Sequence, residues 1–294
     1  MNVNWRNPYE AVKEPFKLKG NLHTHTEHSG CGKLPLTEIL QIYEKMNYAF
    51  IAITDHDIKT DISMLKSASL TVLPGIEIDI KGAKHFGVVN CDSEALYYDA
   101  NATQQEMINR NVEAGGIVVL NHPDWQLREH YTIDELMELK NYTGIEIYNS
   151  VIEFLGGASL STAKWDRLLA AGRRVLGFAN QDFHDSPHAL DCCNVISGND
   201  QSPKRIIAEL LAGRFYCHYG VRINALGRNG DRVFVETDNA KLIRFIGAGG
   251  ILLKKAKSNS AEISFSNSAE CDYIRIECLG EGEEISFSQP FFRG

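Results

Sequence analysis

Residues 20–31 read GNLHTHTEHSGC, and they follow residues 16–19, in which apolar and polar side chains alternate as in a short strand. If the strand continues through this stretch, His23 and His25 lie on the same face, because side chains in a strand repeat every two residues. Two imidazoles side by side at a strand end suit a divalent transition ion such as Zn, Mn or Fe. Exposed or hydrogen-bonded histidines can share this spacing, so a metal site needs partners further along the chain.

Further histidines and carboxylates fall at the ends of the strands predicted after this stretch. Apolar runs predict buried strands at 49–54, 70–80, 84–89, 117–120, 144–148 and 174–179. The residues at or next to the ends of these strands are His56, Glu77, His85, His122, Asp182 and His184. Most follow the C-terminal end of a strand, where α/β barrels build their active sites. The set favours a metal centre, whereas His130, His188 and His218 fit no strand end and are predicted to be structural.

The order of the elements predicts an α/β fold followed by a separate β segment. Helical patterns at 37–47, 104–114, 132–139, 159–171 and 203–212 alternate with the strands, as in a parallel α/β barrel or sheet. After residue 220 the chain has only short strand-like runs broken by Gly, Asn and Ser. We therefore predict one domain over residues 1–219 and a small antiparallel β-sandwich-like domain over residues 220–294.

The composition of the chain argues against several classes of function. Its 294 residues carry a net charge of −8 and no Lys/Arg-rich run, which argues against binding long nucleic acid but not against a small phosphorylated substrate. Seven scattered cysteines without a CxxC pair indicate reduced thiols. Without a signal pattern at residues 1–14 or an apolar run of roughly 18 residues, we expect a soluble, cytoplasmic protein that does not bind membranes. The sequence does not indicate the oligomeric state.

A set of short motifs occurs in a characteristic order along residues 18–219. HTH at 23–25, TDHD at 54–57, GIE at 75–77, His85, NHP at 121–123 and DFH at 182–184 resemble the motifs of the PHP (polymerase and histidinol phosphatase) family of metal-dependent phosphoesterases. The resemblance implies a distorted (β/α)7 barrel with two or three divalent ions, Mn, Fe or Zn, at its C-terminal mouth. It implies that His23, His25, Glu77 and Asp182 hold one ion, that Glu77 bridges to a second ion held by His85 and His122, and that His56 and His184 belong to a third.

One position departs from this resemblance. Many small-phosphoesterase relatives read Ser-Asp-Gly after the second histidine, with the Asp on the third ion, whereas this chain reads Ser29-Gly30-Cys31-Gly32. His28 or Cys31 could replace that carboxylate, since imidazole and thiolate both ligate zinc. The prediction from the sequence is a weak or absent third position, with Cys31 an ordinary small residue.

The ligand set predicts a metal-dependent hydrolase of phosphoric esters. Two ions about 3.5–4 Å apart can share a hydroxide and clamp the oxygens of an in-line displacement at phosphorus. Glu77 and Asp182 would hold these ions, and His56 or His184 would protonate the leaving alkoxide if the third position is empty. The substrate would be a small phosphorylated metabolite, such as a sugar phosphate, a nucleotide or a short oligonucleotide end.

Two other functions and three supporting residues follow from the same pattern. The cluster could instead hydrolyse amides or lactones, or the chain could be a non-catalytic metal-binding scaffold. Asp55 and Asp57 are predicted to orient His56 and its neighbours, although Asp57 could equally cap a helix. Arg128 could pair with a substrate phosphate, although a solvated surface arginine is the commoner case.

Overall fold

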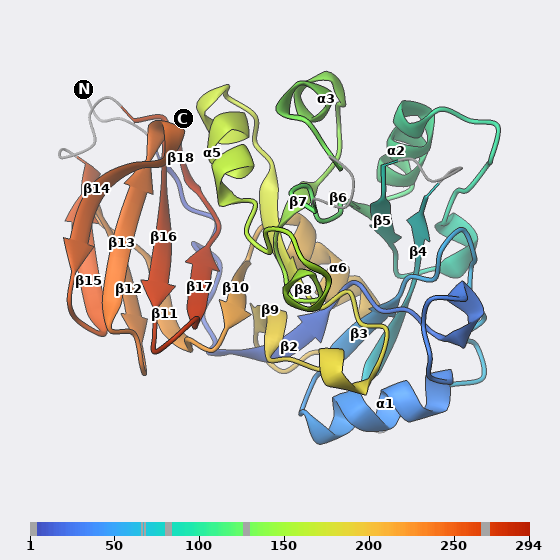
Figure 1. Ribbon diagram of the computed structural model, residues 1–294. Helices are drawn as coiled ribbons and strands as arrows, with labels where there is room; N and C mark the ends of the chain where they lie inside the picture. The colour runs from blue at the N-terminus through green and yellow to red at the C-terminus, as the bar shows by residue number, and fades with distance from the viewer. Residues whose placement is uncertain (1–4, 66, 68, 80–83, 126–129, 266–270) are drawn as a thin grey trace.

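The computed structural model describes residues 5–294 except 66, 68, 80–83, 126–129 and 266–270, and its centre is a strongly curled sheet (Figure 1). The strands of the curled part are β2 (Phe16–Asn21), β3 (Phe50–Ile53), β4 (Thr71–Ile78), β5 (Phe86–Val89), β6 (Ile117–Leu120), β7 (Gly144–Asn149), β8 (Leu176–Asn180) and β9 (Cys192–Ser197). The α-helices are α1 (Leu36–Lys45), α2 (Gln104–Glu113), α3 (Ile133–Glu138), α4 (Ile152–Leu155), α5 (Thr162–Ala170) and α6 (Pro203–Leu211). Short 3₁₀ turns are η1 (Glu27–Ser29), η3 (Ser93–Ala95), η4 (Ser186–His188) and η5 (Ala248–Gly250).

Most neighbouring strands of the curled sheet run parallel. β2, β3 and β4 form one parallel group and β6, β7 and β8 form another. β5 runs antiparallel between β4 and β6, and β9 runs antiparallel beside β2. The predicted α/β class with a curled, barrel-like sheet is confirmed, but the sheet is mixed rather than purely parallel. The count of seven β/α units stays a prediction.

The two ends of the curled part, β8 and β9, meet through the side chain of Asn194. Its Oδ1 accepts a hydrogen bond from the Ala179 N–H at 3.0 Å, and its Nδ2 donates to the Ala179 carbonyl at 2.9 Å. Nearby, a Cβ on Gly20 would lie 1.9 Å from the ring of Phe50, so only glycine lets β2 approach β3 this closely. Side-chain bonds and close backbone packing therefore shape the curl.

The helices begin where their sequences provide caps. Thr103 starts α2 and Thr132 starts α3, each in a capping box with the glutamate three residues later. The helix predicted at 159–171 begins only at Thr162, because Leu160 is held in a β-bridge with Tyr148. None of the described helices has the length and apolarity that crossing a membrane requires. All seven cysteines are free thiols.

The C-terminal part is antiparallel β structure that continues the same sheet. Its strands are β10 (Phe215–Tyr219), β11 (Ile223–Asn229), β12 (Arg232–Thr237), β13 (Leu242–Gly247), β14 (Ile251–Ala256), β15 (Ser260–Ser264), β16 (Tyr273–Leu279), β17 (Ile285–Ser288) and β18 (Phe291–Arg293). β10 pairs with β9 on one side and with β17 on the other, so the main sheet crosses residue 219 without a break. A boundary between domains at residue 219 stays a prediction.

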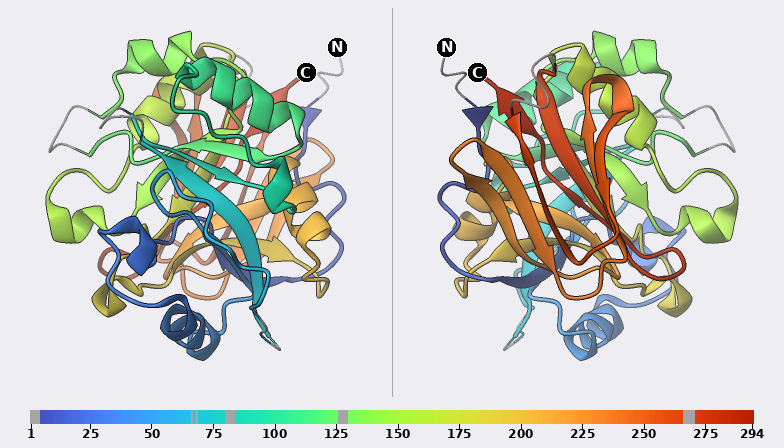
Figure 2. Two further views of the ribbon diagram at one scale, coloured as in Figure 1. Left: turned by 90° about the vertical axis from the view of Figure 1, so that its right-hand side faces the viewer. Right: turned by 90° about the vertical axis from the view of Figure 1, so that its left-hand side faces the viewer.

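A separate sheet of β11, β12 and β15 covers one face of the C-terminal strands (Figure 2). Val233 and Val235 of β12 share a buried cluster with Ile243 and Phe245 of β13, which gives this part the two layers of a sandwich. β18 pairs with β1 (Trp5–Arg6) near the N-terminal end of the chain. Gln289 bonds in both directions to the backbone of Gly177 on β8, at 3.0 and 2.8 Å. The C-terminal strands therefore help to hold the curled sheet together.

Candidate metal centre

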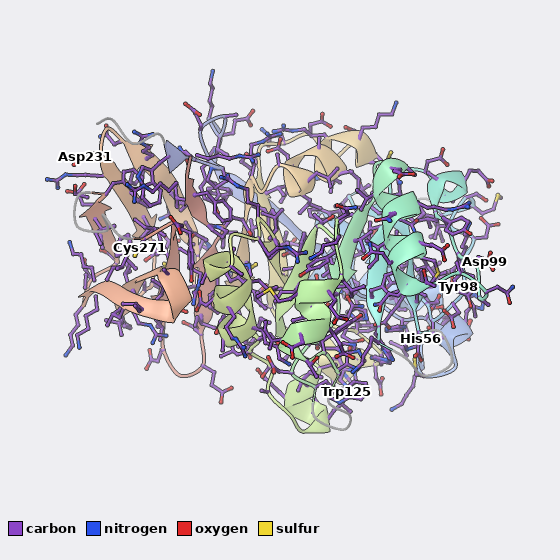
Figure 3. The ribbon with its side chains drawn as sticks, turned by 90° about the horizontal axis from the view of Figure 1, so that it is seen from above. His56, Tyr98, Asp99, Trp125, Asp231 and Cys271 are labelled. Atoms are coloured by element: carbon purple, nitrogen blue, oxygen red, sulfur yellow. The ribbon has the colours of Figure 1, made fainter. Side chains whose placement is uncertain are left out.

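All eight predicted site residues converge beyond one end of the curled sheet. They are His23, His25, His56, Glu77, His85, His122, Asp182 and His184, and each lies within 4 Å of another member. His85 precedes β5 rather than following a strand, but the antiparallel direction of β5 brings it to the same end. His56 of this cluster and the nearby Trp125 lie away from Asp231 and Cys271, which belong to the C-terminal part of the chain (Figure 3).

The strand expected to carry His23 and His25 ends earlier than predicted. β2 stops at Asn21, and the following segment is held by a β-bridge between Thr24 and Phe183. The Nε2 atoms of the two histidines nevertheless lie 3.1 Å apart. The two side chains therefore point the same way, as predicted. The backbone there is held by a single β-bridge rather than by a continuous strand.

Glu77 lies between two groups of histidines, and each of its carboxylate oxygens faces one group. Oε2 is 3.2 Å from Nε2 of His23 and 3.1 Å from Nε2 of His25. Oε1 is 3.3 Å from Nδ1 of His85 and 3.4 Å from Nε2 of His122. A carboxylate placed in this way can contact two ions at once, one through each oxygen.

Asp182 completes the group around His23 and His25. Its Oδ1 is 3.2 Å from Nε2 of each histidine, and its Oδ2 is 3.8 Å from Nε2 of His122. Two imidazole nitrogens and two carboxylate oxygens therefore surround one point, while His85 and His122 face Glu77 from the other side.

Several buried atoms of this cluster have no hydrogen-bond partner in the part of the chain that the structure describes. Those that face the other members of the cluster are Glu77 Oε2, Asp182 Oδ1, His56 Nδ1 and His85 Nδ1. Leaving one such group unpaired costs about 1–3 kcal/mol, so a fold does not collect several without compensation. Divalent cations would compensate them, because carboxylate oxygens and imidazole nitrogens are their usual ligands. The residues present therefore fit a site for divalent metal ions.

The charges of the cluster hold its carboxylates in the ionised form. Burial alone would raise the pKa of Glu77 and Asp182, but the neighbouring histidines, His23 foremost, lower both pKa values well below the usual range. Burial opposes protonation of His23, yet Asp182, Glu77 and Glu146 raise its pKa well above the ordinary value. Burial also opposes protonation of His85, whose pKa Glu77 nevertheless raises to about 10. Without metal, protons occupy positions that cations would take, and metal binding displaces them.

Glu146, which the sequence analysis did not identify, orients His23. This buried carboxylate accepts hydrogen bonds at Oε1 from His23 Nδ1 and Asn180 Nδ2, at 2.8 and 2.9 Å. At Oε2 it accepts from the His122 backbone N–H and from Asn149 Nδ2, both at 2.8 Å. With its proton on Nδ1, neutral His23 presents the Nε2 lone pair to the cluster. A glutamate inside the apolar run at 144–148 was the available signal, since buried carboxylates are rare without partners.

Ser29 orients His25 in a similar way. Its Oγ donates its only proton to Asp55 Oδ1 at 2.8 Å, so it accepts from His25 Nδ1 and from the His56 backbone N–H, each at 2.9 Å. Neutral His25 therefore presents its Nε2 lone pair to the cluster. Burial would raise the pKa of Asp55, but the hydrogen bonds that it accepts, including one from the Thr26 N–H at 2.7 Å, lower it. These bonds agree with the predicted orienting role of Asp55.

His130 lies beside the cluster, which its sequence position did not suggest. Its Nε2 accepts a hydrogen bond from the His85 backbone N–H at 2.9 Å, and burial, with the charges of His122 and His85, lowers its pKa to about 2. The proton of this neutral ring is then on Nδ1, so neither nitrogen has a lone pair for a metal. Asp79 helps to orient His85. Its Oδ1 lies 3.1 Å from Nε2 of His85, so the other ring nitrogen, Nδ1, faces Glu77.

A third group of possible ligands comprises His56, His184 and Cys31. Their ligand atoms and one nitrogen of His25 all lie within 4.8 Å of one another. Nδ1 of His184 donates to the Asp182 carbonyl at 2.7 Å, so Nε2 keeps its lone pair. Burial lowers the pKa of His56, and it lowers that of His184 to about 4. Neutral imidazoles suit metal binding, whereas a proton donor would need the charged form.

Three residues of this region have a left-handed backbone. The φ angle is 31° at His122, 52° at Asp182 and 54° at Asp57. Such a conformation costs a non-glycine residue on the order of 1–3 kcal/mol and persists only where surrounding contacts impose it. The bond from the His122 N–H to Glu146 and the bond from the Asp79 N–H to Asp57 Oδ1, 3.1 Å long, provide such contacts. Asp57 therefore helps to fix the backbone between His56 and Asp79.

Arg128, which was predicted as a possible phosphate ligand, lies outside the described residues.

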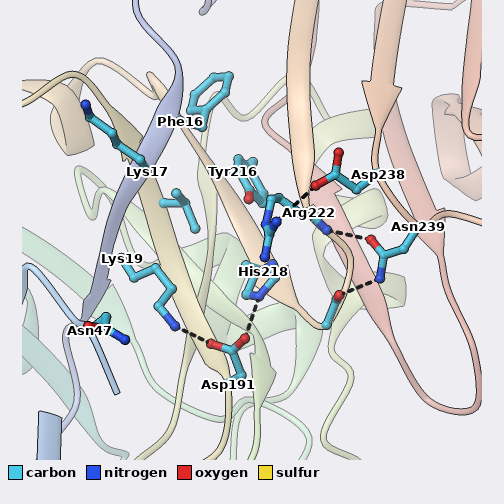
Figure 4. A pocket seen from close by; sticks show the side chains of 12 residues that line it. Phe16, Lys17, Lys19, Asn47, Asp191, Tyr216, His218, Arg222, Asp238 and Asn239 are labelled. Atoms are coloured by element: carbon cyan, nitrogen blue, oxygen red, sulfur yellow. Dashed lines mark hydrogen bonds and ion pairs between the residues drawn. The ribbon is translucent and has the colours of Figure 1, made fainter. Parts of the chain in front are cut away.

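A separate cavity of about 620 Å³ lies beside β2, β9 and β10 (Figure 4). Asp191 accepts a hydrogen bond from Lys19 at 2.9 Å and lies 3.1 Å from Nε2 of His218. Arg222 forms an ion pair of 3.1 Å with Asp238 at the rim. These charged side chains are paired with one another, and none of the lining residues belongs to the metal-binding cluster.

Comparisons with known proteins give little beyond this geometry. No family model matches the sequence, and no curated protein matches it. One similar solved structure, from Bifidobacterium adolescentis, is provisionally described as a metal-dependent phosphoesterase; it is 17% identical, with a TM-score of 0.43 over 67% of this chain and 98% of that one. A likeness at this level says nothing about activity, which has to be inferred from the site.

Proposed function

We propose that this chain is a metal-dependent phosphoesterase of the PHP type that hydrolyses a small phosphorylated metabolite. The observation that carries the proposal is the position of Glu77, with one oxygen toward His23 and His25 and the other toward His85 and His122. A carboxylate between two sets of imidazole ligands suits a pair of ions, which would clamp the attacking and leaving oxygens of a displacement at phosphorus.

The proposed ligands fall into three sets. His23, His25, Glu77 and Asp182 would hold one ion; Glu77, His85 and His122 a second; His56 and His184 a third. Bound Mn, Fe or Zn ions would supply Lewis-acid charge for the phosphoryl oxygens and would make a bound water acidic. Such charge would stabilise the non-bridging oxygens on which negative charge is spread during phosphoryl transfer.

The chain's own residues set the geometry in which this chemistry would occur. Glu146 and Ser29 hold the protons of His23 and His25 on Nδ1, so that both lone pairs face the centre. Asn121 donates a hydrogen bond of 2.7 Å to Glu77 Oε1 and fixes the plane of that carboxylate. Burial around the cluster keeps bulk water from competing for these groups.

The proposed ligands all lie between residues 23 and 184, so the C-terminal strands would support the site rather than form it. A small substrate, such as a sugar phosphate, a nucleotide or a short oligonucleotide end, is consistent with the acidic net charge of −8. The ions would then provide most of the positive charge that meets the phosphate.

The test is a screen of purified protein, reconstituted separately with Mn, Fe and Zn, against phosphate esters and against amides and lactones. We expect turnover of at least one phosphate ester, its loss on chelation, and its return when metal is added back. Close to two or three ions per chain should be found by elemental analysis, and less than one would refute the metal centre. Turnover of amides or lactones alone would assign the site to carbonyl chemistry, and metal binding without any turnover would favour a scaffold.

A further inference from the structure

The loop after His25 is built to hold Cys31 over the cluster. Thr26 caps η1, and Gly32 packs so closely that a Cβ there would lie 2.3 Å from the Thr26 carbonyl oxygen. The next residue, Lys33, donates its backbone N–H to the His184 carbonyl at 2.9 Å. The loop is therefore fixed at both sides of Cys31, and one of the fixing bonds is to the backbone of a proposed ligand.

The thiol lies among imidazoles that have a lone pair available. Cys31 Sγ and one nitrogen each of His25, His56 and His184 lie within 4.8 Å of one another. His25 is already committed, because Nε2 faces Glu77 at 3.1 Å and Nδ1 is bonded to a serine hydroxyl. His56 also faces Glu77 Oε2, with Nδ1 at 3.3 Å, so Nε2 is the nitrogen that it can offer here. Three side chains therefore remain: Cys31, His56 and His184.

We propose that Cys31, His56 and His184 form a thiolate-containing metal position at the mouth of the centre. The inference rests on the proposed metal centre and adds a ligand that the sequence analysis expected to be an ordinary small residue. Cys31 is exposed to solvent while its partners are half-buried, so an ion held by the three would lie on the solvent side of the centre. Three protein ligands with one open position are typical of catalytic rather than structural zinc. His28, the other candidate from the sequence, is exposed on η1.

The sulfur ligand changes which metals this position selects. Thiolate favours Zn²⁺ and Co²⁺, whereas carboxylate-rich sites accept Mn²⁺ and Mg²⁺ readily. The Glu77-bridged positions, with two carboxylates and four imidazoles, can take Mn, Fe or Zn. The centre would therefore bind two chemically different kinds of ion, and Mn²⁺ alone would leave the Cys31 position unfilled.

Cobalt(II) reports sulfur ligation directly, without an activity measurement. We expect the intact protein, titrated with CoCl₂ after metal removal, to show a near-ultraviolet sulfur-to-cobalt charge-transfer band as well as visible d–d bands. Cys31→Ser should lose the charge-transfer band and about one bound ion while keeping d–d absorption from the remaining ions. Cys91→Ser, at the other cysteine that is not fully buried, should keep both.

Labelling of the thiol provides a second, independent readout. In the Cys91→Ser protein, Zn²⁺ should strongly slow the reaction of Cys31 with a thiol reagent, and Mn²⁺ should not. A charge-transfer band that persists in Cys31→Ser, or labelling that Zn²⁺ leaves unchanged, would overturn the inference. Bound cobalt without any sulfur band would refute the Cys31 position alone, whereas a protein that binds no cobalt would refute the metal centre as well.

Discussion

Replacing Glu77 by glutamine tests the centre at the atom on which the proposal depends. Asn121 donates its amide N–H to Glu77 Oε1 at 2.7 Å. A glutamine that placed its own NH₂ group there would set two donors against each other, so it would keep its oxygen toward Asn121. Its NH₂ group would then take the place of Oε2, facing His23 and His25.

The structure thus predicts which ion the Glu77→Gln variant loses. The position of His23, His25 and Asp182 would lose a carboxylate oxygen and gain two N–H donors. The position of His85 and His122 would keep a neutral oxygen. We expect about one ion fewer per chain and a fall in kcat/KM on the order of 10³-fold, equivalent to about 4 kcal/mol in the barrier. The fold should persist, because the two side chains have nearly the same volume.

The assay compares the variant with the parent protein and with Glu113→Gln, at the exposed end of α2. Each protein is reconstituted with Mn or Zn, analysed for metal, and assayed on the best phosphate ester. Full activity in Glu77→Gln would refute the mechanism. Loss of activity with an unchanged metal content would refute the bridging role of Glu77 while leaving the location of the site intact.

Three further outcomes follow from the structure. Glu146→Gln should weaken metal binding about 10- to 100-fold in a metal titration, because it removes the partner of His23 Nδ1, and an unchanged affinity would contradict its orienting role. Burial opposes protonation of His85, but Glu77 raises its pKa to about 10 in the folded protein, above an unfolded value of about 6.5. Protonated His85 therefore stabilises the metal-free protein fully below pH 6.5, and this stabilisation is lost as the pH rises toward 10. Thermal melts of metal-free protein should therefore show a falling midpoint over this window, and a smaller fall in His85→Gln. Asn194→Ala should lower the free energy of unfolding by about 1–3 kcal/mol for each of the two Ala179 backbone groups that lose a partner, as measured by urea denaturation.

The elements that the sequence predicted well depend on local regularities. Apolar runs gave the buried strands β3, β4 and β6 within a few residues, and the histidines and carboxylates beyond strand ends identified the cluster. The carboxyl edge of a sheet collects such residues from segments far apart in the chain, so their position relative to strands carries the information. The roles of these residues as ligands stay predictions.

The features that the sequence could not provide depend on contacts between distant segments. β5 runs antiparallel because of the way the chain connects it to β4 and β6. The hydrophobic pattern of residues 84–89 does not indicate this direction. β9 and β10 were not predicted. In β9 the polar Asn194 interrupts the apolar run, and it is buried by a partner from β8. Glu146 reads as an irregularity in an apolar strand until His23, more than a hundred residues away, is placed against it. Cys31 differs again, since the group around it is assembled only when its own loop meets the segments that carry His56 and His184.

The shared strand β10 has a consequence for the order in which the chain can fold during synthesis. One edge of β10 pairs with β9 as soon as both have left the ribosome, but its other edge waits for β17, about seventy residues later. The backbone of Gly177 in β8 waits still longer, for Gln289. A nascent chain could therefore gather every residue of the metal centre while still presenting an unpaired strand edge, which is prone to join other chains. The last strands would then govern when the protein becomes safe from aggregation.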